Sequence, residues 1–162
     1  MKHSIEHLRT IFAYNSLTGI VTWKIKARSD MSIGSVAGSA TIEGYIEIQY
    51  RGVRYFAHNL GWALHYGEWP SSKLDHENCC AGNNWISNLR LATLSQNKAN
   101  SRIYINNTSG FKGVTAFGNR WRAEISVNKK KIRLGFFSSK EAAALAYMNA
   151  AKLHFGEFAR RG

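Results

Sequence analysis

The hydrophobic period changes once in the last third of the chain, and this change restricts the fold more than any other feature. In "NRWRAEISVN", residues 119–128, apolar and polar residues alternate, as on a β-strand with one buried face. "KKIRLGFF", residues 130–137, repeats the alternation, and "NKK", residues 128–130, joins the two as a turn. From residue 138 the period becomes helical. Ser138 and Glu141 have capping-box spacing, and Gly156 is a C-terminal stop.

This pattern predicts a three-stranded antiparallel sheet packed on one helix. "GVTAF", residues 113–117, supplies a shorter first strand. The expected helix-facing side carries Trp121, Ala123, Ile125, Val127, Ile132, Leu134 and Phe136. The opposite side then presents a basic grid of Arg120, Arg122, Lys131 and Arg133 to solvent. A small basic sheet face can enter a DNA major groove, although a merely solvated face fits the pattern as well.

The charge distribution favours binding. The chain of 162 residues has a net charge of +12, which indicates a polyanionic partner, either nucleic acid or an acidic membrane surface. A basic protein without such a partner is the alternative. Residues 101–162 hold 12 of the 22 Lys and Arg residues but only 3 of the 10 Asp and Glu residues. The last third therefore carries most of the electrostatic attraction.

The first part of the chain has a different composition. Residues 1–57 contain "GIVTWKIKA", "GYIEIQY" and "VRYFAH", which predict short antiparallel strands. "NLGWALHYGEW" predicts a short helix that stops before Pro70, and "INNTSG", residues 105–110, is a polar linker. The two cysteines are adjacent, so we expect no disulfide framework and a reducing compartment. No signal peptide or membrane span is evident.

The C-terminal third resembles the APETALA2/ethylene-response-factor DNA-binding domain. The shared marks in residues 109–159 are "KGV", "W-x-A-E-I", "LG-F-F", "EAA-A-Y--AA" and a closing "G-F-A". The resemblance implies that the sheet lies in the major groove of double-stranded DNA. By position, the implied DNA contacts are Lys112, Thr115, Arg120, Arg122, Ser126 and Arg133, to which the charge pattern adds Lys131. Plant members commonly have arginine where this chain has Thr115 and Ser126.

The middle of the chain pairs an acid with an imidazole. Asp75 and His76 are adjacent in "KLDHENC", and Asn88 and Asn97 follow. This order resembles the H-N-H nuclease motif in its H-N-N form. The upstream stretch "GYIEIQYRGVRYFAHNLGWALHYGEWP" resembles the corresponding region of phage and intron-associated H-N-H endonucleases, which often end in an APETALA2-type domain.

The resemblance implies two strands and a helix around one divalent metal ion. "KLDH" and "LRLA" would be the strands, and Thr93 and Gln96 have capping-box spacing for a helix that carries Asn97. The same two residues stand where zinc-containing relatives have cysteines, so we expect no structural zinc.

The chemistry of phosphodiester hydrolysis suits these residue types. His76 is the predicted general base, because neutral imidazole accepts a proton near neutral pH. Asp75 and Asn97 offer hard oxygen ligands for Mg²⁺ or Mn²⁺. Asn88, Asn84 and His58 are predicted to support the site. Taken singly, each residue has an ordinary alternative: a lone histidine is more often structural, Asp75 could cap a turn, and Asn97 could be solvated.

The loop between the two strands departs from the family pattern. Family members commonly have "D-H-x-N-G-D-x-x-D-N-R", whereas this chain has "DHENCCAGNNWISN". Cys79 and Cys80 replace Gly-Asp, and Trp85 replaces an arginine. The turn geometry of this loop is therefore expected to differ from that of the family.

Taken together, these features predict an α+β protein. Residues 1–102 are expected to form an H-N-H (ββα-metal) endonuclease domain with a β-rich N-terminal part, residues 103–107 a linker, and residues 108–160 the APETALA2-type domain. The predicted enzyme is a monomeric homing, mobile-element or phage endonuclease, acting on DNA in the cytoplasm of a bacterial or phage-infected cell. The alternatives are a non-catalytic DNA-binding regulator with a decayed nuclease site and an RNA-binding module.

Overall fold

The computed structural model describes residues 3–160, and the chain divides into two compact units, Met1–Leu91 and Ala92–Gly162. Both units combine helices with small antiparallel sheets, as expected for an α+β protein. Within residues 3–160, every helix is too short or too polar to span a lipid bilayer.

The first unit contains three small sheets. Its elements are α1 (Ile5–Ile11), β1 (Phe12–Tyr14), β2 (Val21–Trp23), β3 (Ser39–Ala40), β4 (Ile46–Tyr50), β5 (Val53–Phe56), α2 (Ala57–Tyr66), β6 (Lys73–His76), a 3-10 turn η1 (Ile86–Asn88) and β7 (Leu89–Ala92). β1 pairs with β2, β4 lies between β3 and β5, and β6 pairs with β7. The predicted strands before residue 57 are confirmed as β2, β4 and β5. The sequence patterns did not predict α1, whose cap Ser4 accepts a hydrogen bond from the His7 amide.

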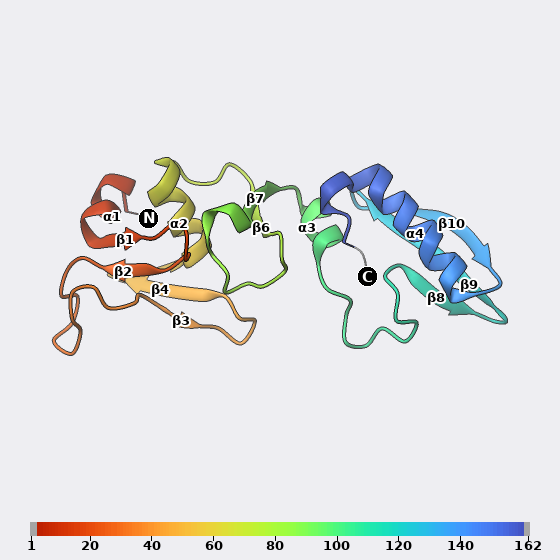
Figure 1. Cartoon of the computed structure of the whole chain (residues 1–162), viewed down its shortest axis with the longest axis horizontal. Helices are drawn as coiled ribbons and strands as arrows, with labels where there is room; N and C mark the ends of the chain where they lie inside the picture. The colour runs from red at the N-terminus through yellow and green to blue at the C-terminus, as the bar shows by residue number, and fades with distance from the viewer. Residues whose placement is uncertain (1–2, 161–162) are drawn as a thin grey trace. The chain divides into compact units, whose positions relative to one another are not determined.

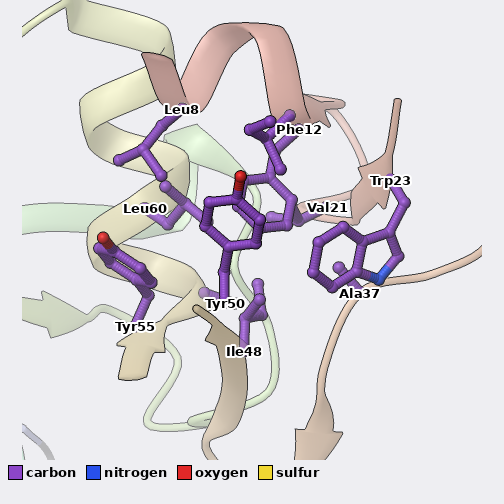
Figure 2. Packing of buried hydrophobic residues seen from close by; sticks show 11 residues of the cluster. Leu8, Phe12, Val21, Trp23, Ala37, Ile48, Tyr50, Tyr55 and Leu60 are labelled. Atoms are coloured by element: carbon purple, nitrogen blue, oxygen red, sulfur yellow. The ribbon is translucent and has the colours of Figure 1, made fainter. Parts of the chain in front are cut away.

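An aromatic core holds the first unit together. Phe12, Leu8, Ile48 and Leu60 are fully buried, and Figure 2 shows them converging from the two helices and the strands. The rings of Phe12 and Trp23 lie 4.6 Å apart between their centroids. Full burial of such side chains stabilises a fold by about 1.5–3 kcal/mol each. This core fixes the junction between β5 and α2, where His58 lies.

The second unit is a three-stranded sheet with a long helix on one face (Figure 1). Its elements are α3 (Leu94–Asn100), β8 (Val114–Phe117), β9 (Arg120–Val127), β10 (Lys130–Phe137), α4 (Lys140–Phe155) and a 3-10 turn η2 (Gly156–Phe158). β9 lies between β8 and β10. Ala143 and Ala144 of α4 are buried against Val114 and Ala123, because small side chains allow the helix to approach the sheet closely.

The structure corrects two details of the predicted sheet and helix. The register between β9 and β10 shifts between Arg133 and Gly135, so the strand bulges at this point. Phe136 therefore lies opposite Arg122 on the basic face, and the prediction that it faces the helix is wrong. Phe137 takes that place. The cap of α4 is Ser139, whose side chain accepts from the Ala142 amide, rather than Ser138.

Helix α3 packs within the second unit. It starts with the predicted capping box of Thr93 and Gln96. Ala99 is buried with Ile125, Ala151, Phe155 and Phe158. The Lys112 ammonium donates to the carbonyl oxygens of Lys98 (3.0 Å), Ala99 and Ser101 (2.7 Å), at the C-terminal end of α3. Cations favour this end of a helix.

The two compact units divide before α3, between Leu91 and Ala92, whereas the predicted nuclease domain extends to residue 102.

Candidate active site

Strand β6 brings two ionisable side chains into the interior of the first unit. Asp75 is 4% exposed and His76 is 7% exposed. Neighbouring residues of a strand point to opposite faces, so the two side chains meet different partners. Asp75 contacts Arg90 of β7, and His76 contacts the β5–α2 junction and the loop after β6.

A buried hydrogen bond orients His76. Its Nε2 atom lies 2.9 Å from Oδ1 of Asn84. Because a carbonyl oxygen only accepts, Nε2 carries the ring proton and Nδ1 carries the lone pair. Burial lowers the pKa of His76, although the hydrogen bond to Asn84 and the charge of Asp75 oppose the shift. His76 is therefore held as a neutral imidazole with one defined basic nitrogen.

His58 lies against His76 in a cluster of rings. The two imidazoles meet edge to face with centroids 5.2 Å apart. Phe56 stacks on His58, and Tyr45 packs against both histidines at 5.5 Å and 6.0 Å. Nδ1 of His58 is buried and has no hydrogen-bond partner within the described part of the chain. Burial, with a smaller effect of His76, lowers the pKa of His58 to about 4.

Asp75 is held by a short ion pair. Nε of Arg90 donates to Oδ2 of Asp75 at 3.0 Å, and both side chains are largely shielded from water. Nothing in the patterns of the sequence had singled out Arg90. Among residues 3–160, no three His, Cys, Asp or Glu side chains are grouped as metal ligands.

The donor types suit a hard divalent ion better than a soft one. Mg²⁺ is usually held by one or two carboxylates, its waters and the substrate phosphate, so a single carboxylate with an amide oxygen fits it. The structure describes Asp75 in the first unit and Asn97, on α3, in the second. Their pairing in one metal site stays a prediction.

Asn88 closes the loop between β6 and β7. It is buried, and its amide donates to the Asn83 carbonyl at 2.7 Å and to Oδ1 of Asn78 at 3.1 Å. The side-chain oxygen of Asn88 accepts a hydrogen bond from the backbone N–H of Asn78 at 3.1 Å. Cys79, inside this loop, has φ +57°, in the left-handed region that glycine favours. The loop thus has a left-handed residue where the family pattern has glycine.

The N-terminal hairpin supports the same loop. The Tyr14 hydroxyl donates to the Asn84 carbonyl at 2.7 Å, and the Ile86 amide donates to the Ser16 carbonyl at 2.9 Å. A Cβ atom on Gly19 would lie 2.3 Å from the Asn84 carbonyl carbon, so only glycine allows the approach. Burial raises the pKa of Tyr14 to about 12, with a smaller contribution from Tyr66, and the hydroxyl keeps its proton. The sequence patterns missed these contacts because the partners are far apart along the chain.

Most of the predicted DNA contacts lie on one surface of the second unit, and Lys112 does not. Thr115, Arg120, Arg122, Ser126, Lys131 and Arg133 lie on the sheet face opposite α4, which we call the basic face. Three residues that were not predicted as contacts lie on the same face: Phe117 of β8, Glu124 of β9 and Phe136 of β10. All of these except Arg122 and Glu124 are exposed. Glu124 forms ion pairs with Arg122 (3.3 Å) and Arg133 (3.6 Å). Lys112 is instead bound to α3.

Comparison with known proteins finds a family match in the middle of the chain. A family model described as HNH endonuclease matches residues 55–99, which include His58, Asp75, His76, Asn84, Asn88 and Asn97. A solved structure titled "DNA binding and cleavage by the HNH homing endonuclease I-HmuI" is 18% identical, with a TM-score of 0.45, over 97% of this chain and 95% of that one. None of the curated proteins matches.

Replacing Cys79 by glycine should stabilise the first unit. A non-glycine residue in the left-handed region costs about 1–2 kcal/mol, and the greater freedom of glycine in the unfolded chain offsets part of this gain. We expect the free energy of unfolding to rise by up to about 1 kcal/mol, measured by urea denaturation. Cys80→Gly is the control: Cys80 has a negative φ, and this variant should be less stable than the wild type.

Acid should destabilise the fold through His58. Its pKa is about 4 in the folded chain and about 6.5 when unfolded. Between these values the unfolded chain binds more protons, so the stabilisation is complete above pH 6.5 and is lost as the pH falls towards 4. The contribution of this residue is up to about 3 kcal/mol. Urea denaturation from pH 7.5 to 4.5 should show a shallower loss for His58→Gln than for the wild type, and equal losses would contradict the assignment.

Proposed function

We propose that this chain is an endonuclease that hydrolyses phosphodiester bonds of double-stranded DNA with the help of a divalent metal ion, and the match of residues 55–99 to the HNH endonuclease family model supports this proposal. The proposed general base is His76, and the proposed metal ligands are Asp75 and Asn97. The hydrogen bond between His76 and Asn84 is the observation that carries the proposal, because it defines one basic ring nitrogen inside a segment of nuclease type.

The side chains of the first unit suit proton abstraction from water. His76 is neutral near neutral pH because burial lowers its pKa, so Nδ1 can accept a proton. When the ring becomes charged, the amide oxygen of Asn84 stabilises the proton on Nε2. Arg90 pairs with Asp75 and orients its carboxylate. A bound Mg²⁺ or Mn²⁺ ion would neutralise charge on the scissile phosphate.

The basic face of the second unit is the proposed DNA-binding surface. Arg120, Lys131 and Arg133 are exposed there, and Arg122 lies among them half-buried. Arginine pairs with guanine edges, and lysine mainly holds phosphates. The arrangement of three strands and one helix agrees with the resemblance to the APETALA2-type domain. A phage or mobile-element role and action as a monomer remain part of the proposal.

Replacing His76 by alanine should abolish cleavage but not binding. We expect the wild type to nick supercoiled plasmid with Mg²⁺ or Mn²⁺ and to lose activity in chelator, and His76→Ala to lose at least about a hundredfold in rate. His154→Ala, an exposed histidine on α4, is the matched control and should keep wild-type activity. Equal nicking by His76→Ala would refute the base. Binding without metal-dependent nicking by the wild type would favour the non-catalytic regulator.

Removing a cation from the basic face should weaken DNA binding and its salt dependence. For Lys131→Ala, we expect the slope of log affinity against log salt concentration to become less steep by about one. The variant makes one phosphate contact fewer, so its binding releases fewer counterions from the DNA. Lys152→Ala on α4 is the control and should change neither quantity. Titration of labelled duplex DNA at several salt concentrations measures both. Tighter binding to RNA than to DNA would count against this surface.

A further inference from the structure

Two exposed phenylalanines touch on the basic face. Phe117 lies opposite Arg120 in the β8–β9 register, and Phe136 lies opposite Arg122 in the β9–β10 register, so both rings project from the same side of the sheet as the arginines. Their centroids are 5.0 Å apart. Phe117 is 55% exposed and Phe136 is 39% exposed. They form one apolar patch in the most basic part of the chain.

Cations flank this patch. The guanidinium carbon of Arg122 lies 5.9 Å from the ring centroid of Phe117, and that of Arg133 lies 5.7 Å from the ring centroid of Phe136. These distances are within the range of cation–π attraction, which holds the rings and the guanidinium groups together. Only the bulge in β10 brings Phe136 to this side, since a regular strand would direct it towards α4.

The chemistry of the face selects the ligand. Its cations suit a duplex backbone and guanine edges, whereas phenyl rings cannot pair with polar base edges. In the major groove, the C5-methyl group of thymine is the apolar feature that a base pair presents. We propose that Phe117 and Phe136 contact thymine methyl groups and give this chain a preference for thymine within its DNA site. This inference rests on the proposed binding of duplex DNA by the basic face.

A substrate that differs only in this methyl group tests the proposal. A duplex library of random sequence is amplified with either thymine or uracil nucleotides, and the two products compete for the full-length protein in a binding assay. Burial of one methyl group is equivalent to about a fourfold change in affinity. We therefore expect the wild type to prefer the thymine form by fourfold or more among the bound sequences. Equal binding of the two forms would overturn the proposal.

Variants separate the patch from the surrounding charges. Phe117→Ala and Phe136→Ala should bind both forms equally, and Phe136→Leu, which keeps an apolar side chain, should retain part of the preference. Leu145→Ala, an exposed apolar residue on α4, should keep all of it. Arg120→Ala should weaken binding to both forms by the same factor. A thymine preference that survives in both alanine variants would overturn the proposal, and so would tighter binding of single-stranded than of duplex thymine-rich DNA.

The pattern of results also distinguishes this inference from the proposed function. If Arg120→Ala weakens binding but the phenylalanine variants leave the thymine preference unchanged, then the basic face binds DNA and only the methyl contact is wrong. If Arg120→Ala and both alanine variants bind duplex DNA as the wild type does, then DNA is bound elsewhere and the proposed surface fails with the inference. Thermal unfolding of each variant shows whether the fold is kept.

Discussion

The hydrogen bond between His76 and Asn84 is the interaction on which the proposed chemistry depends. It sets which ring nitrogen carries the proton, and it exists only because the loop after β6 places Asn84 against the imidazole. Three constraints hold that loop: Asn88 binds it from within, Tyr14 holds the Asn84 backbone from the N-terminal hairpin, and Gly19 leaves room for its backbone. The N-terminal residues therefore position the loop of the site, but none of them is a proposed base or metal ligand. Loss of either hydrogen bond would leave partly buried polar groups without these partners.

The environment of β6 gives the two neighbouring side chains different partners. Asp75 is paired with the Arg90 guanidinium, whereas His76 lies among the rings of His58 and Tyr45, where a charged imidazole is poorly solvated. In the proposed mechanism, the carboxylate is a metal ligand and the neutral imidazole is the base. The alternation of side chains along a strand makes this possible for adjacent residues.

The second unit uses the two faces of one sheet for different purposes. The face towards α4 is lined by small and apolar side chains and stabilises the unit, and helix α3 joins the same core through Ala99. On the other face, Glu124 links Arg122 and Arg133 through ion pairs and thereby orders two of the cations. The bulge in β10 adds Phe136 to that face.

The sequence by itself determined the elements that follow from local pattern. β6 and β7, the capping box of α3, the strands β8 to β10 and the end of α4 at Gly156 were all predicted, because periodicity and capping involve residues a few positions apart. The segment with the nuclease motif was also identified from its residues and spacing. The partners of those residues were not predicted: Arg90 contacts Asp75, and Tyr45 contacts the two histidines. In the second unit, the binding of Lys112 to α3 and the position of Phe136 on the basic face were not predicted either. Only the tertiary structure decided these positions. The contacts join segments that are far apart along the chain, and Phe136 changes face because of one extra residue in β10. Neither feature is visible in a local sequence pattern.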